Sequence, residues 1–560
     1  MEGIHPNISV IYGKNAKKSP YPQRRDIFPE LENFMRSPIE GEARICALYG
    51  LRRTGKTEMM FQCLDCMDQE SREASAYIVM TGEIGMSDLR KCMNALRREG
   101  ICNFFIDEVT SANNFQACAS CLSDYYAKDG CRIVIAGTDS LKIKLASYDE
   151  LYDRAEFINT THVPYAEFSR LLGGRGLDDY IMYGGTLTDK SYKTNQDRTE
   201  YINTAIVKNI LHSLADGAEN EKYWSNVYTM YGEAEVASVI NKMINKFSYN
   251  VMLKAVNRDF KSGAMHAIID GSKEAAFEDI VDDPAVDEGV KRALEVYDRQ
   301  EMSSELTKGA LDNIKGYLEE LGIFKRIPRY ISLQNCVRGD DMEIINQPGM
   351  VYAHSEVLMR QLAYDRNWNP NSSMEARRNF TFRADNYVKG TIMERVILLE
   401  TYLAIGKSER GRFYVSQIDI AKGNREVPYE GERAEADLAV VDLDAGCSYL
   451  FEVKHSAEPV PEYQARHLLN KDFQDHVARH FAPVRSFAVI YEGPSGIERI
   501  DEGTPVQYIN AEDFLTNIHE LTLKIQKEPS LVDRIDFGEI AGLDPEFDLD
   551  ALDENISYDE

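Results

Sequence analysis

The sequence contains no long apolar run and no recognisable secretory leader. None of its apolar segments approaches the ~18 consecutive apolar residues that a membrane-spanning helix needs. The first ten residues, MEGIHPNISV, lack a basic region followed by an apolar stretch. The 10 cysteines form no small disulfide-rich framework, which is typical of proteins in a reducing compartment. We therefore expect a cytoplasmic protein without a membrane partner.

Positive charge is also scarce. The chain has 64 Lys and Arg against 92 Asp and Glu, which gives a formal net charge of −28. Nucleic-acid binding depends largely on attraction to phosphates, so this chain is not expected to coat DNA indiscriminately. The charge is uneven, because residues 531–560 hold eleven acids and one base, whereas residues 360–412 hold ten bases and six acids. Any contact with nucleic acid must therefore be local.

Core-forming residues, in contrast, are plentiful. Hydrophobic residues make up 43% of the chain, and its 560 residues suggest roughly three or four domains. From residue 43, short apolar strands alternate with helical stretches, which favours a parallel sheet covered by helices. The predicted division is an N-terminal arm and helix (1–40), an α/β core (41–175), a helical domain (176–300), a winged-helix-like segment (301–350), a second α/β domain (385–515) and an acidic tail (531–560).

A phosphate-binding pattern occupies residues 50–57. GLRRTGKT matches Gly-x4-Gly-Lys-Ser/Thr between a predicted strand and a predicted helix, where backbone N–H groups can face phosphates. Lys56 is expected to reach the β- and γ-phosphates, and Thr57 to ligate Mg²⁺. The other loop residues expected to contact the nucleotide are Gly50, Arg53, Thr54 and Gly55. Residues 41–175 are therefore predicted to form a P-loop ATPase core that uses ATP and Mg²⁺.

Later segments of this core carry further candidate residues. FFIDE ends in two acids, of which Asp107 is expected to hold Mg²⁺ and Glu108 to polarise the attacking water. The strand RIVIA precedes Thr138 and Asp139, which would lie between the two motifs and could sense the γ-phosphate. Arg154 could be an arginine finger for a neighbouring subunit of a homo-oligomer, or it could satisfy a carbonyl in its own domain. The sequence leaves both roles open.

A second constellation lies near the C-terminus. Asp437 begins the apolar part of the predicted strand ADLAVVDL, and Glu452 and Lys454 end the predicted strand YLFEVK. Two neighbouring strands joined by a turn would place these side chains on one side of a small sheet. The two carboxylates and a backbone carbonyl could then hold Mg²⁺, which activates water. Lys454 would orient that water or neutralise developing charge.

The motifs YGLRRTGKT, FFIDE and AGTDS…LYDR…VPYAEFSRLL resemble prokaryotic AAA-type (archaeal-ATPase-like, P-loop) ATPases, in which a winged helix and a C-terminal PD-(D/E)XK nuclease-like domain follow the ATPase core. The resemblance covers most of residues 40–515. It implies an α/β multi-domain fold with a P-loop ASCE/AAA-type core, a helical and winged-helix middle and a restriction-endonuclease-like C-terminal domain. It also implies that Glu394 is an additional acid of the nuclease site and that Gln464 is its polar helix residue.

The resemblance implies an ATP-binding and hydrolysing regulatory ATPase that controls a Mg²⁺-dependent DNA nuclease domain. The alternative is a signalling or scaffold NTPase whose nuclease-like domain binds a protein partner and does not cleave. Salt-sensitive DNA binding would separate the two, since the scaffold alternative predicts little or none.

Several charged or metal-ligating residues have two interpretations. Nearby arginines could contact a nucleic-acid backbone or could be ordinary surface residues; they are Arg377, Arg378, Arg383 and Arg395. The acidic tail could cover the basic region or the nuclease cleft as a DNA mimic, or it could be solvated. Paired cysteines and histidines at helical spacing are expected to be buried thiols and a solvated helix face, not zinc sites; they are Cys63/Cys66, Cys118/Cys121 and His476/His480.

Overall fold

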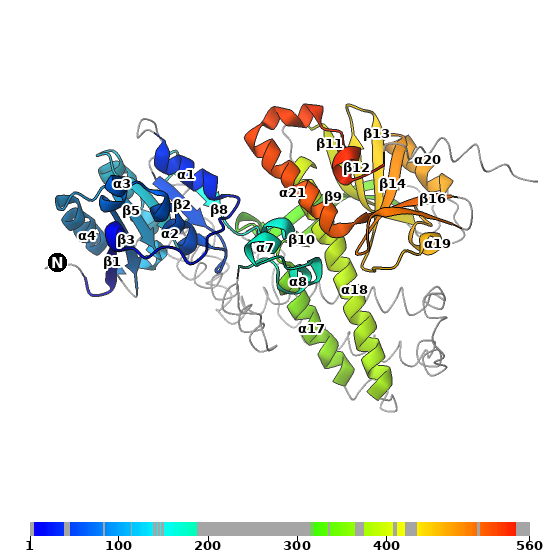
Figure 1. The fold of residues 1–560 in the computed structure, drawn as a ribbon, viewed down its shortest axis with the longest axis horizontal. Helices are drawn as coiled ribbons and strands as arrows, with labels where there is room; N and C mark the ends of the chain where they lie inside the picture. The colour runs from blue at the N-terminus through cyan, green and yellow to red at the C-terminus, as the bar shows by residue number, and fades with distance from the viewer. Residues whose placement is uncertain are drawn as a thin grey trace, which may run out of the picture.

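The computed structural model describes two lobes joined by short helices (Figure 1). The described residues are 5–37, 45–81, 84–113, 115–137, 143, 146, 151–187, 315–316, 318–333, 336–364, 374–406, 411–420, 434–500 and 504–544. Almost all of the predicted helical domain lies outside them, as do Thr138, Asp139 and the end of the acidic tail. Within the described part of the chain, no helix is both long and apolar enough to cross a bilayer.

The N-terminal lobe is built on one six-stranded sheet with the order β1-β3-β5-β7-β2-β8. Its strands are β1 (Ile8–Tyr12), β2 (Ile45–Tyr49), β3 (Ser75–Met80), β5 (Asn103–Asp107), β7 (Arg132–Ala136) and β8 (Ala155–Asn159). All neighbouring strands are parallel except β1, which runs antiparallel to β3. The strand that ends in the two acids, β5, is therefore separated from the phosphate-loop strand β2 by β7.

Helices cover both faces of this sheet, which explains why β2 and β5 are buried along their whole length. One face packs against α1 (Phe28–Arg36) and α2 (Lys56–Cys66). The other packs against α4 (Met86–Arg98), α5 (Phe115–Cys118) and the π-helix η3 (Leu122–Ala127). The thiol of Cys63 on α2 is buried in the first of these cores. The N-terminal arm is part of the lobe, since it supplies the edge strand β1.

The C-terminal lobe contains an eight-stranded mixed sheet with the order β10-β9-β11-β12-β13-β14-β16-β15. Its strands are β9 (Phe324–Leu333), β10 (Cys336–Ile345), β11 (Phe413–Ile420), β12 (Ala434–Asp442), β13 (Cys447–Lys454), β14 (Val484–Tyr491), β15 (Gly496–Arg499) and β16 (Pro505–Asn510). The strands β11, β12 and β13 form an antiparallel meander, and β14 runs parallel to β13. An α/β architecture is thus present in both lobes.

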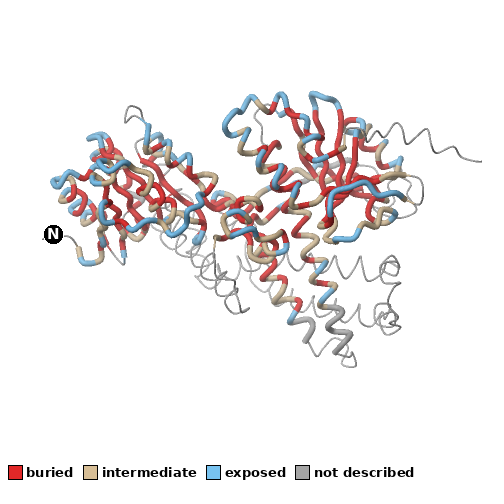
Figure 2. Tube along the Cα trace, viewed as in Figure 1, coloured by how far each residue is buried: buried red, intermediate tan, exposed pale blue. Residues whose placement is uncertain are grey.

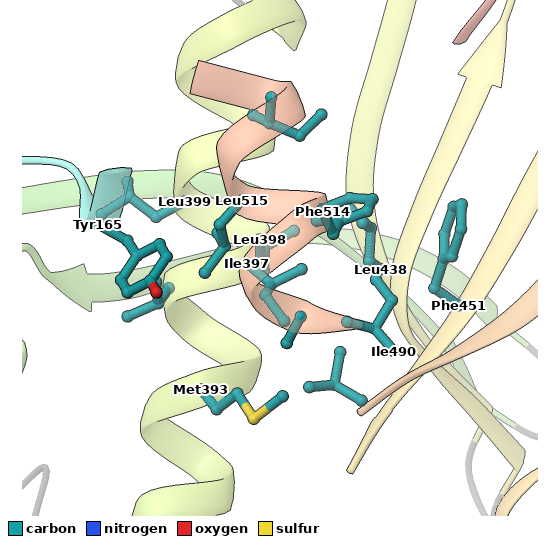
Figure 3. Close-up of a cluster of buried hydrophobic side chains, with 14 of the residues drawn as sticks. Tyr165, Met393, Ile397, Leu398, Leu399, Leu438, Phe451, Ile490, Phe514 and Leu515 are labelled. Carbon is teal, nitrogen blue, oxygen red and sulfur yellow. The ribbon is translucent and has the colours of Figure 1, made fainter. Parts of the chain in front are cut away.

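Two layers of helices enclose this second sheet. The long helix α18 (Met374–Thr401) and α21 (Ala511–Lys527) pack on one face, where Ile397, Phe514 and Leu438 meet (Figure 3). The short helix α19 (Pro461–Gln464) and α20 (Lys471–His480) follow β13 in the chain, and α20 packs on the opposite face. Figure 2 shows that buried residues gather in the two sheets and in the connection between the lobes.

The hairpin β9–β10 differs from the prediction. The sequence predicts a separate winged-helix-like segment over 301–350, but β9 pairs in parallel with β11 and so extends the C-terminal sheet. The chain does turn at Gly322, whose φ of 78° lies in the left-handed region that favours glycine, directly before β9. Local sequence indicates a helix followed by a hairpin, whereas the pairing of the hairpin edge depends on a strand about ninety residues away.

Two short helices, one inside the predicted ATPase core and one directly after it, pack in the other lobe. These are α7 (Tyr165–Leu171) and α8 (Leu177–Tyr183), which contact α17 (Pro348–Tyr364), α18 and α21. Tyr165 lies beside Leu399 and Leu515 in the same apolar cluster (Figure 3). The helices α7 and α8 therefore tie the ATPase sheet to the C-terminal sheet.

The first half of the predicted acidic tail is structural. Residues 531–544 form the end of η6 (Pro529–Arg534) and α22 (Phe537–Ala541), and Phe537 is fully buried against Phe413, Tyr449 and Phe451. The expectation of a solvated tail is therefore wrong for the buried residues of this segment. The charges dominate its composition, but a few apolar side chains at the right positions suffice to dock it.

Candidate functional site

The phosphate loop connects β2 to α2, as the motif requires. Gly50 has φ 138° and Gly55 has φ 92°. A Cβ atom on Gly50 would lie only 2.6 Å from Thr160 Oγ1, so glycine is required there for both conformation and space. Thr54 is buried, and its hydroxyl donates to Leu51 O at 2.8 Å. The side chain of Thr54 therefore braces the loop, while Arg53 is exposed.

Lys56 is the first residue of α2, and its side chain reaches back to the start of the phosphate loop. Its Nζ donates to the carbonyl oxygens of Gly50 at 2.8 Å and Leu51 at 2.6 Å. Removal of the ammonium from water lowers the pKa of Lys56 to about 8, although Asp107 and Glu108 oppose this shift. No carboxylate oxygen makes a hydrogen bond to Nζ among the described contacts. The ammonium is held by neutral carbonyl dipoles, and an incoming phosphate would be a stronger partner.

The side chain of Asp107, at the end of β5, is hydrogen-bonded to Thr57 at the start of α2. Its Oδ2 accepts hydrogen bonds from Thr57 Oγ1 and from the hydroxyl of Tyr77, each at 2.7 Å, and its Oδ1 accepts one from Glu108 N at 2.9 Å. A hydroxyl and a carboxylate beside a phosphate loop are the hard oxygen donors that Mg²⁺ prefers. Thr57 and Asp107 thus fit a Mg²⁺ ion. Tyr77 belongs to no motif, so the sequence alone does not indicate its place in the site.

Glu108 begins a turn directly after the strand. Its φ of 55° lies in the left-handed region, which is uncommon for a residue other than glycine. The 3₁₀ turn η2 (Val109–Ser111) follows it. Backbone strain of this kind often occurs where a catalytic side chain must leave a sheet edge in a fixed direction.

Arg154 lies at the opposite edge of the sheet. It directly precedes β8, and the first residue of β8, Ala155, pairs with the first residue of β2, Ile45. The phosphate loop follows the last residue of β2, so Arg154 and the loop lie at opposite ends of these strands. The guanidinium Nε lies 3.7 Å from Asp124 Oδ1 within the same lobe. A contact between Arg154 and a nucleotide would therefore require a second copy of the chain, and both predicted roles stay open.

Arg25 is a further residue of the site that no sequence motif indicates. It is 4% exposed, and its guanidinium donates to Thr54 O at 2.6 Å, Thr160 O at 3.0 Å and Glu167 Oε1 at 2.7 Å. It thus connects the phosphate loop, the end of β8 and α7. The arm sequence contains two adjacent arginines, and nothing local indicates which of them becomes buried.

The C-terminal lobe brings together the three residues predicted on two strands. Asp437 on β12 and Glu452 on β13 lie one residue beyond the paired positions Leu438 and Phe451, so they are opposite each other. Lys454 Nζ lies 2.8 Å from Glu452 Oε2 and 4.0 Å from Asp437 Oδ2. Asp437 Oδ2 also accepts a hydrogen bond from Val453 N at 2.9 Å.

The electrostatics of this cluster are unusual because both acids are almost fully buried, at 4% and 3% exposure. Burial and the charge of Glu452 raise the pKa of Asp437 well above its ordinary value. Burial alone would lower the pKa of Lys454, but Glu452 and Asp437 outweigh it and raise that pKa. Two carboxylates share one lysine. A second positive charge, such as a metal ion, would stabilise the ionised form of Asp437. The oxygen donors of the cluster fit Mg²⁺.

The other residues predicted near this cluster have mixed outcomes. Glu394 on α18 is close enough for its charge to help raise the pKa of Lys454. Gln464 on α19 is buried, and its Oε1 accepts hydrogen bonds from Val460 N at 2.8 Å and Tyr508 OH at 2.7 Å, so its amide braces the local chain. His467 was not predicted, yet its Nδ1 lies 3.7 Å from Glu452 Oε1.

Two predicted surface features are buried instead. His476 is fully buried on α20, where its ring packs near Tyr330 of β9, so the expectation of a solvated helix face is wrong for this residue. Arg395 lines a small internal cavity with His162 and Glu400, and burial lowers the pKa of Arg395 to about 9. Arg383 is half-buried, and the side chains of Arg377 and Arg378 lie outside the described residues.

Comparison with known proteins supports the ATPase part. Residues 42–169 match a family model described as an AAA domain. No curated protein matches the chain. Among solved structures, the ORC1 protein of Aeropyrum pernix in complex with DNA is 13% identical over 60% of this chain and 93% of that chain, with a TM-score of 0.21, a value too low to carry an argument. The match and the loop geometry together support a P-loop AAA-type ATPase domain over residues 42–169.

Proposed function

We propose that this protein is an ATP-binding and hydrolysing ATPase whose N-terminal lobe controls a Mg²⁺-dependent DNA nuclease site in its C-terminal lobe. The observation that carries the nuclease part is the convergence of Asp437, Glu452 and Lys454 on two neighbouring strands. The element order from α18 to β14 supports it, because it brings Glu394 of α18 close enough to act on Lys454 beside the two acid-bearing strands.

In the ATPase site, each residue has a separate task. Lys56 would exchange its two carbonyl partners for phosphate oxygens, which are stronger acceptors. Thr57 and Asp107 would hold Mg²⁺, which supplies charge neutralisation on the phosphates. Glu108 would orient the attacking water and accept its proton. Thr138 and Asp139 remain predicted sensors of the γ-phosphate, and Arg154 remains a predicted finger for a second copy.

In the C-terminal site, Asp437 and Glu452 would hold Mg²⁺, which supplies an activated water and charge neutralisation. Lys454 would leave Glu452 and donate toward the phosphate or the water as negative charge develops. Glu394 would add a third acid from α18. Before the metal binds, two carboxylates at this place in a chain of charge −28 would repel DNA phosphates, so the bound Mg²⁺ would have to supply the positive charge that attracts them.

Contacts between the lobes give a physical basis for control. Arg25 holds the phosphate loop, and the adjacent Asp26 accepts from His519 of α21, with 2.8 Å between His519 Nε2 and Asp26 Oδ2. Glu512 at the start of α21 accepts from Leu177 N of α8 at 2.7 Å. A shift of the loop on nucleotide binding would therefore act on α21 and α8 through bonded neighbours.

The last contact of this series lies beside the proposed nuclease site. Asp178 of α8 accepts from His455, with 3.0 Å between Oδ1 and Nε2, and His455 directly follows Lys454. Glu492 lies 3.2 Å from the same Nε2, and Lys389 Nζ lies 3.5 Å from Asp178. These four residues form a cluster of charged and titratable side chains between α8 and the rest of the C-terminal lobe. It is the contact through which α8 would shift Lys454.

The nuclease proposal is tested by incubating purified full-length protein with plasmid and single-stranded DNA in Mg²⁺ or Mn²⁺. Wild type should cut, Lys454→Ala should not, and the matched control Lys524→Ala, a largely exposed lysine of α21, should cut like wild type. Equal nicking by wild type and Lys454→Ala would identify a contaminant. Absence of cutting by wild type with each substrate, with and without ATP, would contradict the nuclease assignment.

A second candidate is a signalling or scaffold NTPase whose C-terminal lobe binds a protein partner. The net charge of −28 favours it, because such a charge opposes DNA binding. DNA affinity that falls steeply with salt supports the nuclease, whereas no measurable affinity at low salt supports the scaffold.

A further inference from the structure

Tyr77 brings a buried hydroxyl to the ATPase site from a strand that contains no motif. It lies on β3 opposite Phe105 of β5, two residues before Asp107. The side chain is 3% exposed, and its hydroxyl donates to Asp107 Oδ2 at 2.7 Å. The same oxygen accepts from Thr57 at 2.7 Å. Two hydroxyls from different elements therefore converge on one carboxylate oxygen.

These contacts hold the carboxylate of Asp107 at both oxygens, because Glu108 N donates to Oδ1. Of the two donors to Oδ2, Thr57 is also expected to ligate Mg²⁺, whereas Tyr77 has no other predicted task, so the Tyr77 bond is the one that fixes this oxygen when the metal is bound. Partners of this kind, one step removed from a metal, orient its ligands and commonly change metal affinity 10- to 100-fold, roughly, when they are lost.

We propose that Tyr77 is a positioning residue of the ATPase site. Its hydroxyl fixes the Asp107 carboxylate in the orientation that accepts the Mg²⁺ of Mg·ATP. It thereby sets how strongly Mg²⁺ increases the affinity for nucleotide. The inference rests on the ATPase function and is independent of the proposed nuclease.

The hydroxyl can be removed without disturbing the packing of the ring. The Tyr77 ring contacts the Phe61 ring of α2, with centroids 4.6 Å apart, and it belongs to the apolar cluster that includes Leu48 and Phe105. Tyr77→Phe keeps these contacts and deletes one hydrogen bond, while Asp107 keeps its bonds from Thr57 and Glu108. A fold defect is therefore not expected.

The test compares nucleotide affinity with and without the metal. Calorimetric titration with a non-hydrolysable ATP analogue would be done in EDTA and in saturating Mg²⁺ for wild type, Tyr77→Phe and Tyr126→Phe. Tyr126 is the matched control, because it is buried in the same lobe and its hydroxyl lies 3.2 Å from Asn94 Oδ1, outside the ATPase site.

We expect the affinity gain from Mg²⁺ to fall about 10-fold in Tyr77→Phe, with affinity in EDTA unchanged and kcat for ATP lowered in parallel. Tyr126→Phe should match wild type in both buffers. An unchanged Mg²⁺ gain in Tyr77→Phe would overturn the inference. So would an equal loss of affinity in EDTA and in Mg²⁺, which would indicate a purely structural role. A wild type that binds nucleotide without any Mg²⁺ gain would refute the metal site itself.

Discussion

The two lobes each hold a lysine at the centre of a candidate site, and the surroundings of the two lysines are opposite. Lys56 is held by backbone carbonyls, and desolvation lowers its pKa to about 8. Lys454 lies between two buried carboxylates that raise its pKa. The first ammonium makes its described hydrogen bonds to neutral carbonyls and suits an incoming anion. The second belongs to an excess of negative charge and suits an incoming cation.

The largest effect is expected in the C-terminal lobe. Lys454→Ala should reduce DNA cleavage by about 100-fold or more, because the lysine that both carboxylates share is lost at the point where charge develops. ATP binding should remain within about twofold of wild type, since that site is in the other lobe. Cleavage would be followed on plasmid DNA, and ATP affinity by calorimetry. Loss of both functions together would contradict two separate sites.

Lys56→Ala should have the reverse pattern. Loss of a desolvated charge that pairs with phosphate costs about 2–5 kcal/mol, so ATP binding should weaken roughly 30-fold or more. The basal cleavage of DNA without ATP should persist. Calorimetric ATP titration checks the first result, with Lys91→Ala, an exposed lysine of α4, as the comparison variant. Unchanged affinity in Lys56→Ala would show that the loop does not bind the phosphates.

Phe537→Ala tests how the segment after α21 contributes to the C-terminal lobe. The side chain is fully buried among Phe413, Tyr449 and Phe451, so its truncation should lower the free energy of unfolding by about 3–5 kcal/mol. Chemical denaturation of the two proteins measures the difference, and Ile497→Ala, at an exposed position, should be near neutral. A loss below about 1 kcal/mol would show that this segment is not part of the core.

The smallest effect concerns the contact between Asp26 and His519. Burial opposes it, but Asp26 and the nearby Glu400 and Glu167 raise the pKa of His519 above 6.5. A raised pKa in the folded state gives stability that is complete below the unfolded pKa and is lost as pH rises through the folded value. Arg170 also faces Asp26, with 2.8 Å between Nη2 and Oδ1.

Wild type should therefore exceed His519→Ala in stability by about 1 kcal/mol near pH 6, and by less near pH 9. Thermal unfolding at both pH values measures this difference. A constant difference, or one that grows with pH, would show that the charged imidazole does not stabilise the contact.

The comparison of lobes also shows what the sequence could predict. The phosphate loop could be identified because its residues are contiguous, and the loop geometry follows from glycines at fixed positions. Asp437, Glu452 and Lys454 could be grouped because a short turn joins their strands. Both cases depend on short-range chain geometry.

The residues that escaped prediction depend on long-range packing. Tyr77 reaches Asp107 only because β3 pairs with β5, and Arg25 becomes buried only because α7 returns across the arm. His476 is buried because β9 joins the sheet beside it, although a hairpin at that place in the sequence predicts a separate unit. Single-residue patterns contain no information on such pairings.

The central claim is that the ATPase lobe controls a nuclease site in the other lobe. The most direct measurement is plasmid cleavage in Mg²⁺, with and without ATP, by wild type, Lys56→Ala and Lys454→Ala. We expect ATP to change the cleavage rate of wild type. Lys56→Ala should cut at the same rate with and without ATP, and Lys454→Ala should be inactive in both conditions. The same ATP response in Lys56→Ala as in wild type, or cleavage by Lys454→Ala at the wild-type rate, would contradict the account.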